Sequence, residues 1–359
     1  MSHTKEDLKE LQSKTLEEKI QISTARIIEW YEGWGGQVYI SNSGGVDSTV
    51  LSDLVHRVYP DVPDVFVDTG LEYPELREFI KNKPNVITLY PAMNFVEVIK
   101  KYGYPLISKE VSRDVHCAKS CPNGKTAKKF EENSEYCQKY GTRYCLAKYK
   151  NLVNAPFRLS NQCCNIMKKD TVKHFEKRTG RHGFVGSMTE ESNRREKTWL
   201  KQGCNAFTNQ QPISAPLSFW TKSDILEYLV KYNIPYASVY GEIVQDNKGK
   251  YKTTGTDRTG CVFCGFGVTP IKSKRPNKFQ KLAITHPKLY DYCMKGGRYD
   301  EQGMWIPDKG LGMAKVLDYI NVKWWNDGDE EKRDEYRRIY HEKEEAEAQR
   351  KLTESETNE

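Results

Sequence analysis

The sequence predicts an α/β protein built on a doubly wound parallel sheet. Short apolar runs rich in β-branched and aromatic residues alternate with segments of helical periodicity through the first hundred residues. The runs lie at 37–41, 64–70 and 85–90, and the helical segments that follow them lie at about 47–58, 74–82 and 94–102. Strands that alternate with helices at this spacing are typical of a parallel sheet with helices on both faces.

The same rhythm returns after a polar interruption. A helix is predicted around 166–178, a strand at 182–188 and a helix at 221–232, where Thr221 and Asp224 form a capping-box pattern. Four segments are therefore predicted: an N-terminal helix in 1–36, an α/β domain over 37–240 with a Lys-rich insertion at 103–160, a cysteine-containing region at 241–327, and a charged helical segment at 328–359 that ends in a disordered tail.

Composition narrows the class of protein. The 359 residues carry a net charge of +7, from 56 basic and 49 acidic side chains. The sequence has no apolar run of eighteen residues, and its N-terminus lacks the apolar stretch of a signal peptide, so we expect a cytoplasmic protein without a membrane partner. In a reducing compartment, ten cysteines favour metal ligation or reactive thiols over disulfides.

A glycine-rich turn between a predicted strand and helix predicts a phosphate site. Gly44 and Gly45 can adopt backbone angles closed to other residues and can turn their N–H groups outward. The helix that begins near Asp47 adds its dipole and free N-terminal amides, and hydroxyl donors stand at Ser43, Ser48 and Thr49. The loop is not a Walker loop, because the Gly-Lys-Ser/Thr sequence is missing. The simpler alternative is a tight turn in which Asp47 or Ser48 caps the helix.

Several motifs in this order resemble one family. SNSGGVDSTVLSDLV (41–55) resembles the pyrophosphate loop of the ATP-pyrophosphatase (adenine nucleotide alpha hydrolase) superfamily, and specifically of its PAPS (phosphoadenosine phosphosulfate) reductase-like family. VFVDTGLEYPEL, GSMTEESNRRE and APLSFWTKSDILEYLVKYNIPYASVY are similar to later segments of that family. The resemblance covers roughly 37–270, apart from the insertion, and it implies an enzyme.

The resemblance also implies site residues. Phosphate would be held by Ser43, Gly44, Gly45, Asp47, Ser48 and Thr49, and the adenosine would lie near Asp68, Thr69 and Gly70. The reacting phosphate or sulfonate would be bordered by Glu191, Ser192, Arg194 and Arg195, and Lys168 would contact the nucleotide. Asp47, Arg194 and Arg195 would be catalytic. Without the family context, the charged residues of this set are surface side chains in salt bridges.

Two cysteine motifs predict a metal centre. Cys261 and Cys264 form a Cys-x-x-Cys pair, and the tandem pair Cys163-Cys164 precedes it. Four cysteines can hold an iron–sulfur cluster or zinc, although a tandem pair needs a helix end or a strained turn. The combination resembles the [4Fe–4S] site of assimilatory adenylylsulfate reductases, and structural zinc is the alternative. A second group in the insertion has no recognised spacing, and its role stays open: Cys117, Cys121, Cys137 and Cys145.

Two departures from the family shape the functional hypothesis. Sulfonucleotide reductases carry a C-terminal Glu-Cys-Gly-type nucleophile, whereas the last cysteine here is Cys293. The phosphate loop is intact, which suits Mg-ATP cleaved between its α and β phosphates. The sequence thus predicts sulfur transfer or substrate adenylation with an iron–sulfur cluster. The alternatives are a sulfonucleotide reductase that releases sulfite, and a nucleotide-binding module with structural zinc.

The partners follow from this hypothesis. The nucleotide is an adenine nucleotide, and a sulfur donor or an electron-donor protein is needed. The sulfur acceptor is either a small molecule or a nucleic acid. Lysines of the insertion and of the following region, such as Lys125, Lys128, Lys272 and Lys274, supply the positive charge that a nucleic acid requires, although such lysines also serve as solvated surface.

Overall fold

The computed structural model describes residues 3–141, 145–208, 210–269 and 275–356. It divides into two compact units, of which the first comprises Met1–Pro91 and Lys169–Cys261. The second comprises Ala92–Lys168 and Val262–Glu359, so the Lys-rich insertion and the C-terminal region belong to one unit. Lys272 and Lys274, which the sequence marks as basic surface, and the last three residues of the predicted tail lie outside the described residues.

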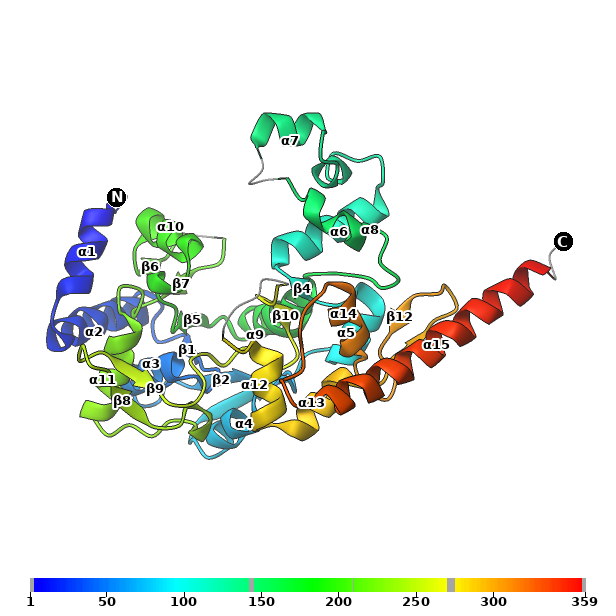
Figure 1. Cartoon of the computed structure of the whole chain (residues 1–359). Helices are drawn as coiled ribbons and strands as arrows, with labels where there is room; N and C mark the ends of the chain where they lie inside the picture. The colour runs from blue at the N-terminus through cyan, green and yellow to red at the C-terminus, as the bar shows by residue number, and fades with distance from the viewer. Residues whose placement is uncertain (1–2, 142–144, 209, 270–274, 357–359) are drawn as a thin grey trace. The chain divides into compact units, whose positions relative to one another are not determined.

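The first unit is built on a six-stranded sheet with the order β3-β2-β1-β5-β7-β6 (Figure 1). All neighbouring strands are parallel except β6 and β7. The strands are β1 (Val38–Ser41), β2 (Asp64–Val67), β3 (Val86–Leu89), β5 (His182–Val185), β6 (Asn205–Ala206) and β7 (Ile213–Ser214). This is the α/β architecture that the sequence predicts, and it gathers the carboxyl ends of β1, β2 and β5 at one edge of the sheet.

Helices cover both faces of this sheet. Successive side chains of β1 point to opposite sides, so each face presents apolar side chains that a layer of helices buries. Val38 and Ile40 are fully buried in a large core that also holds residues of α2 (Leu16–Gly33), α3 (Val46–His56) and α11 (Lys222–Lys231). Tyr39 faces the other way and packs against Phe175 of α9 (Asp170–Thr179). The sheet is therefore doubly wound.

Among the described residues, three further helices, two 3-10 turns and one hairpin complete the first unit. They are α1 (Lys5–Ser13), α4 (Pro74–Lys81), α10 (Asn193–Gln202), η4 (Thr189–Glu191), η5 (Ser238–Tyr240) and the pair β8 (Ile243–Gln245) and β9 (Tyr251–Thr253). The capping box that the sequence predicts at the start of α11 is confirmed: Thr221 Oγ1 accepts the Asp224 N–H, and Asp224 accepts the Thr221 N–H.

The prediction of a single N-terminal helix is wrong. The structure forms two helices, α1 and α2, which are separated at Lys14, where the backbone is extended. Thr15 caps α2, and the Glu18 carboxylate accepts a hydrogen bond from the Thr15 N–H. This capping box starts a new helix in the middle of the apolar pattern. Periodicity alone does not detect this break, because both helices bury leucines.

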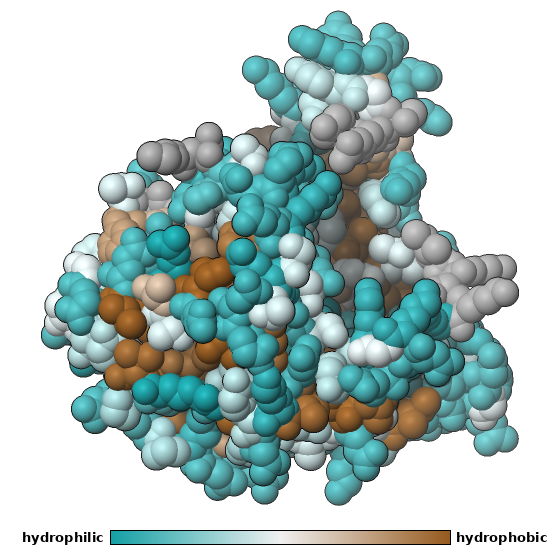
Figure 2. Space-filling model, turned by 90° about the vertical axis from the view of Figure 1, so that its left-hand side faces the viewer, coloured by the Kyte–Doolittle hydropathy of each residue, from teal (hydrophilic) through white to brown (hydrophobic). Residues whose placement is uncertain are grey.

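The second unit is mainly helical. Its elements are α5 (Phe95–Tyr102), β4 (Leu106–Ile107), α6 (Lys109–Ser120), η1 (Ala127–Phe130), α7 (Glu135–Tyr140), η2 (Ala147–Tyr149), α8 (Lys150–Val153), η3 (Asn165–Lys169), β10 (Gly265–Phe266), α12 (Lys278–Thr285), α13 (Pro287–Met294), β11 (Arg298–Tyr299), β12 (Trp305–Ile306), α14 (Met313–Tyr319) and α15 (Glu330–Glu356). Figure 2, which views the left-hand side of Figure 1, shows a surface of mostly hydrophilic residues with patches of hydrophobic ones among them. Of the described helices, none has both the length and the apolarity to cross a bilayer.

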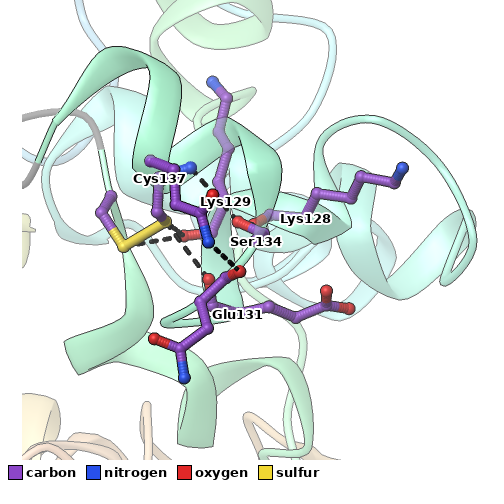
Figure 3. Close-up of a disulfide and its surroundings, with 8 residues drawn as sticks. Lys128, Lys129, Glu131, Ser134 and Cys137 are labelled. Atoms are coloured by element: carbon purple, nitrogen blue, oxygen red, sulfur yellow. Dashed lines mark hydrogen bonds between the residues drawn. A yellow bond between two sulfur atoms is a disulfide. The ribbon is translucent and has the colours of Figure 1, made fainter.

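The insertion contains a disulfide, which corrects the expectation that the cysteines are ligands or free thiols. Cys137 of α7 and Cys145 are bonded, with their Cα atoms 5.0 Å apart (Figure 3). Both sulfur atoms lie near the carbonyl oxygen of Lys129, because α7 packs against η1. Cys117 and Cys121 of the same insertion are free and exposed. The spacing of the four cysteines does not reveal which two of them meet.

A buried ion pair holds α2 against α11, and removing it tests how much this contact stabilises the first unit. Lys19 is 2% exposed, and its Nζ lies 2.7 Å from Asp224 Oδ2 at the cap of α11. We expect Lys19→Met to lower the free energy of unfolding by about 2 to 3 kcal/mol, because Asp224 keeps its charge and loses its cation. Arg26→Met removes an exposed pair of the same helix and should cost less than about 0.5 kcal/mol. Urea denaturation measures the free energy of unfolding of both variants, and equal losses of stability would contradict the role of the Lys19–Asp224 pair.

Candidate functional site

The loop between β1 and α3 supplies the frame of the candidate site. Gly44 has φ of +76°, a conformation that suits glycine, and a side chain there would lie 3.3 Å from the Leu76 carbonyl oxygen. Gly45 caps α3 without a side-chain hydrogen bond. The helix then begins at Val46, so the N–H groups of its first turn lack intrahelical partners. This strand, glycine turn and helix start are the arrangement that the sequence predicts for anion binding.

The glycine N–H groups do not both point outward, as the sequence leads us to expect. The Gly44 N–H donates to Asn42 Oδ1 at 2.9 Å, and the Gly45 N–H lies 3.4 Å from Ser43 Oγ. The Ser43 N–H donates to Ser48 Oγ at 3.2 Å. The loop is thus braced by its own side chains, and the N–H groups of Asp47 and Ser48 at the helix start are left to meet a ligand.

A cavity of about 340 Å³ opens at this helix start, a volume typical of small-molecule sites. All of its lining residues belong to the first unit. The lining includes six residues that the sequence predicts: Ser43, Gly45, Asp47, Ser48, Glu191 and Arg195. It also includes Ser41, Val185, Gly186, Ser187, Lys222, Tyr240, Asp257, Arg258, Thr259 and Gly260.

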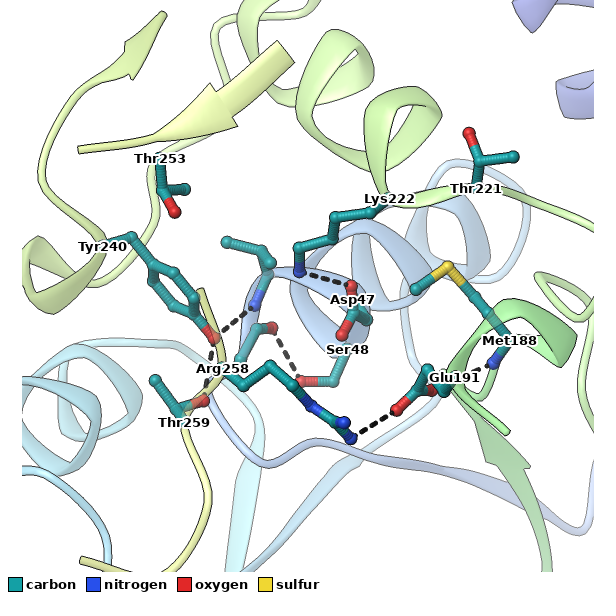
Figure 4. A network of polar contacts seen from close by, with 12 residues as sticks. Asp47, Ser48, Met188, Glu191, Thr221, Lys222, Tyr240, Thr253, Arg258 and Thr259 are labelled. Carbon is teal, nitrogen blue, oxygen red and sulfur yellow. Dashed lines mark hydrogen bonds and ion pairs between the residues drawn. The ribbon is translucent and has the colours of Figure 1, made fainter. Parts of the chain in front are cut away.

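Charged side chains face one another across this cavity (Figure 4). Lys222 Nζ lies 3.0 Å from Asp47 Oδ1, and Arg258 lies 3.0 Å from Glu191 Oε2. Arg195 also pairs with Glu191. Burial and the charge of Arg258 lower the pKa of Arg195, whereas the carboxylate of Asp47 raises it. Two guanidinium groups that disfavour each other therefore share one carboxylate, an arrangement that a bound anion stabilises.

Tyr240 closes one side of the loop. Its hydroxyl oxygen accepts the Val46 N–H at 3.3 Å and lies 2.8 Å from Thr259 Oγ1 (Figure 4). Burial raises the pKa of this hydroxyl to about 12, so it stays protonated at neutral pH. Tyr240 thus joins the start of α3 to the segment that carries Arg258.

The residues predicted to contact adenosine do not line the cavity. Asp68 accepts hydrogen bonds from the Arg77 guanidinium, at 2.8 Å, and from the Gly70 N–H. Thr69 binds Glu72 through both its N–H and its hydroxyl. These residues follow β2 at the same sheet edge, but the interactions that the structure shows for them are local, and their contact with adenosine stays a prediction.

Five other predicted residues also lie outside the lining: Gly44 of the loop, Lys168, Thr49, Ser192 and Arg194. Arg194 is exposed on α10, and Ser192 caps that helix by accepting the Arg195 N–H. Thr49 lies in the first turn of α3, and its Oγ1 is buried without a hydrogen-bond partner among the described residues. The structure therefore brings Arg195 to the cavity but leaves Arg194 at the surface.

The predicted cysteine ligands form a separate feature. Cys163 and Cys164 begin a helical turn that continues as the π-helix η3, which is the kind of position a tandem pair needs. A hydrogen bond from Cys163, the charges of Lys109 and Lys168, and a hydrogen bond from Lys109 together lower the pKa of Cys164 to about 6. Lys168, predicted to contact the nucleotide, thus lies beside this thiol in the second unit.

Cys264 belongs to the same neighbourhood. Burial raises the pKa of its thiol, Lys278 lowers it, and the charge of Cys164 raises it further. Cys261 is the last residue of the first unit. Within the described ranges, no three His, Cys, Asp or Glu side chains form a group that could hold a metal ion. The donor chemistry fits an iron–sulfur cluster, since cysteine thiolates are its ligands and Cys164 has a lowered pKa, but the cluster itself stays a proposal.

Comparison with known proteins places the chain in a family. The model of the phosphoadenosine phosphosulfate reductase domain matches residues 37–265, which is more than half of the chain. The chain belongs to the phosphoadenosine phosphosulfate reductase domain family. The match includes the β1–α3 loop, every residue that lines the cavity, and both cysteine pairs.

Members of this family named as enzymes are among the relatives. Adenosine 5′-phosphosulfate reductase 1 of Bacillus subtilis is 29% identical over 270 residues, covering 74% of this chain and 89% of that protein. An uncharacterised protein of Methanocaldococcus jannaschii is 24% identical over 322 residues, covering 84% of this chain but 61% of its own length. A solved phosphoadenylyl-sulfate reductase from Candida auris is 13% identical, and the match covers 70% of this chain and 98% of that protein. The TM-score is 0.36, too low to indicate a shared structure.

The polar side chains that line the cavity but are missed by sequence reasoning include Lys222, Tyr240, Arg258 and Thr259. Lys222 and Tyr240 lie within a stretch that resembles the family, but nothing in their spacing shows that they face the loop. Arg258 and Thr259 lie in a turn-rich segment without a motif. The fold brings them to α3 from up to about two hundred residues away, as with Lys222 and Asp47, which are 175 residues apart.

The thiol of Cys164 gives a direct test of this electrostatic environment. In the metal-free protein, we expect its alkylation by iodoacetamide to rise with pH with a midpoint near 6, because the thiolate persists above its lowered pKa. Lys109→Met should move the midpoint upward, whereas Lys101→Met, which changes an exposed lysine of α5, should not. Peptide mass spectrometry locates the label. A midpoint of about 8.5, the pKa of an ordinary thiol, would contradict the lowered pKa of Cys164.

Proposed function

We propose that this protein binds Mg-ATP through its phosphates and cleaves it between the α and β phosphates, in sulfur transfer or in adenylation of a substrate. The observation that carries the proposal is the cavity at the start of α3, where Ser43, Asp47 and Ser48 meet three cationic side chains. The intact glycine loop and the family match support an adenine nucleotide as the ligand.

The charge balance of the cavity favours a metal-complexed phosphate. Its lining carries three cations, Lys222, Arg195 and Arg258, and three carboxylates, Asp47, Asp257 and Glu191. A bare triphosphate would meet the carboxylates as like charges. Mg²⁺ would remove this repulsion, since carboxylate oxygens and phosphate oxygens are its preferred ligands. We therefore expect ATP binding to depend on Mg²⁺, with Asp47 as a candidate ligand.

The proposed step is an in-line displacement at the α phosphorus. An oxygen of the acceptor forms a bond to that phosphorus and releases its proton, while the bridging oxygen leaves with pyrophosphate. Negative charge grows on the leaving group, and the start of α3 together with Arg195 and Lys222 would stabilise it. Arg258 and Glu191 would orient Arg195. The acceptor is either a small molecule or a nucleic acid, and the sulfur or electrons come from a donor protein or molecule.

An iron–sulfur cluster is the second part of the proposal. Cys163, Cys164, Cys261 and Cys264 would hold it, and Lys109 and Lys278 would stabilise its negative charge. A cluster bound there would supply a centre for electron transfer or for holding sulfur. Structural zinc on the same thiolates is the alternative.

A sulfonucleotide reductase is the second candidate function. The name of the Bacillus subtilis relative, an adenosine 5′-phosphosulfate reductase, favours it. In that reaction, adenylylsulfate would receive two electrons from a dithiol donor and yield sulfite and AMP. The same cavity would hold the phosphate of the nucleotide.

Product analysis distinguishes these functions. We expect the protein with Mg-ATP and an acceptor to release pyrophosphate and form the adenylated acceptor, with AMP released when an added sulfur donor displaces it. Lys222→Met should lower the rate of pyrophosphate release about tenfold to a hundredfold, because a cation at the leaving group is lost. Lys231→Met, on the same helix but paired with Glu17 at the surface, is the control and should match wild type. Sulfite released from adenylylsulfate, without pyrophosphate from ATP, would instead establish the reductase. Binding without turnover would leave only a nucleotide-binding module.

The cluster has its own test. Anaerobically purified protein should contain iron and acid-labile sulfide and show thiolate-to-iron charge-transfer absorbance in the visible range. Cys264→Ser should remove most of the iron, whereas Cys121→Ser, which changes an exposed free thiol of the insertion, should retain it. A colourless wild-type protein that contains zinc would refute the cluster without affecting the nucleotide proposal.

A further inference from the structure

A chain of buried polar side chains lies beneath the phosphate loop, and the proposed function does not use it. Asn42 is 2% exposed, and Asp64 and Ser52 are 0% exposed. Burying a carboxylate and an amide is costly unless each is hydrogen-bonded, so their presence in the core requires a reason. The contacts that they make lead directly to the loop.

Strand register places these residues together. Asn42 follows the last residue of β1, and its N–H donates to the Val65 carbonyl oxygen at 3.0 Å. Asp64 is the first residue of β2 and is paired with Ile40 of β1. Ser52 lies on α3, in the turn that packs over this part of the sheet. The strand end, the neighbouring strand and the helix thus meet at one carboxylate.

These neighbours form hydrogen bonds with both oxygens of the Asp64 carboxylate. Its Oδ1 accepts Asn42 Nδ2 at 3.1 Å, and its Oδ2 accepts Ser52 Oγ at 2.9 Å. Lys83 Nζ lies 3.4 Å from Oδ2 and donates to Ser52 Oγ at 2.9 Å. The carboxylate therefore has both hydrogen-bond donors and a cation in the core, which offsets the cost of burying its charge.

The carboxylate in turn fixes the orientation of the Asn42 amide. An ionised carboxylate only accepts hydrogen bonds, so the amide must present Nδ2 to Asp64 and Oδ1 to the loop. Asn42 Oδ1 then accepts both the Gly44 N–H, at 2.9 Å, and Ser48 Oγ, at 3.0 Å. A flipped amide would set oxygen against oxygen at Asp64 and would leave the Gly44 N–H without its acceptor.

We propose that Asn42 and Asp64 are positioning residues of the phosphate site. Asp64 orients the Asn42 amide, and the amide holds the left-handed turn at Gly44 and the Ser48 hydroxyl where the cavity needs them. Neither residue lines the cavity, so both act through the loop. Preorganised loop groups bind an anion more tightly because less conformational freedom is lost on binding. The inference rests on the proposed function, since it requires that this loop binds phosphate.

An exchange of the two side chains tests the proposal. Asn42→Asp removes the donor between the two positions and sets two carboxylates against each other. Asp64→Asn can present either an oxygen or an N–H to Asn42, so the orientation of the Asn42 amide is no longer fixed. We expect each single change to weaken binding of Mg-ATP and of pyrophosphate about tenfold or more. The double variant Asn42→Asp/Asp64→Asn restores one donor and one acceptor and should return the affinity to within about threefold of wild type. Isothermal titration calorimetry measures all four proteins.

Two further variants separate positioning from stability. Ser23→Ala removes a fully buried hydroxyl of α2 that bonds the Pro216 carbonyl oxygen, and it should lower the urea midpoint without changing affinity. Ser52→Ala is the milder change within the network, and it should weaken ATP binding by about threefold even if the Asn42 and Asp64 variants fail to fold.

The outcomes are distinct. Wild-type protein that binds neither ATP nor pyrophosphate overturns the proposed function, and the positioning role with it. Wild-type protein that binds both, with folded single variants or Ser52→Ala of unchanged affinity, overturns the positioning role alone. A double variant as weak as the singles also overturns it, because the donor–acceptor pair would then not be what matters.

Discussion

The reversal of the chain between the end of β1 and the start of α3 is the constraint on which the candidate site depends. Gly44 must be left-handed for the turn to close, and Gly186 at the end of β5 must lack a side chain, since a Cβ there would lie 3.0 Å from the backbone of Asp47. These two glycines let two neighbouring parallel strands and one helix start converge. The cavity exists because a backbone can approach a backbone at this point.

Charge is then arranged around this convergence. The helix start favours an anion. The cations that line the cavity come from α10, α11 and the segment before Cys261, and an equal number of carboxylates is supplied by Asp47, Glu191 and Asp257. A site of this composition holds its cations in place through internal ion pairs before a ligand arrives. Beneath it, Asp64 and Asn42 brace the turn from within the core. The phosphate site is thus preorganised from both the solvent side and the core side.

The sequence predicts the local parts of this structure well. The strand 37–41, the glycine turn and the helix after it depend on neighbouring residues, and so does the capping box at Thr221. Parts that depend on tertiary packing are missed or wrong. Lys222 and Arg258 reach the cavity through the fold, Cys137 meets Cys145 through the packing of α7, and the break at Thr15 lies within an unbroken apolar pattern. Asn42 lies inside a quoted motif, but its role becomes visible only once Asp64 is placed beside it.

A crystal structure of the protein with Mg²⁺ and a non-hydrolysable ATP analogue tests the central claim most directly, because it shows which groups hold the phosphates. The account predicts phosphate oxygens within hydrogen-bond distance of the N–H groups of Asp47 and Ser48, with Arg195 and Lys222 turned towards them. Phosphates bound elsewhere in the chain, with the cavity at α3 filled only by solvent, would contradict it.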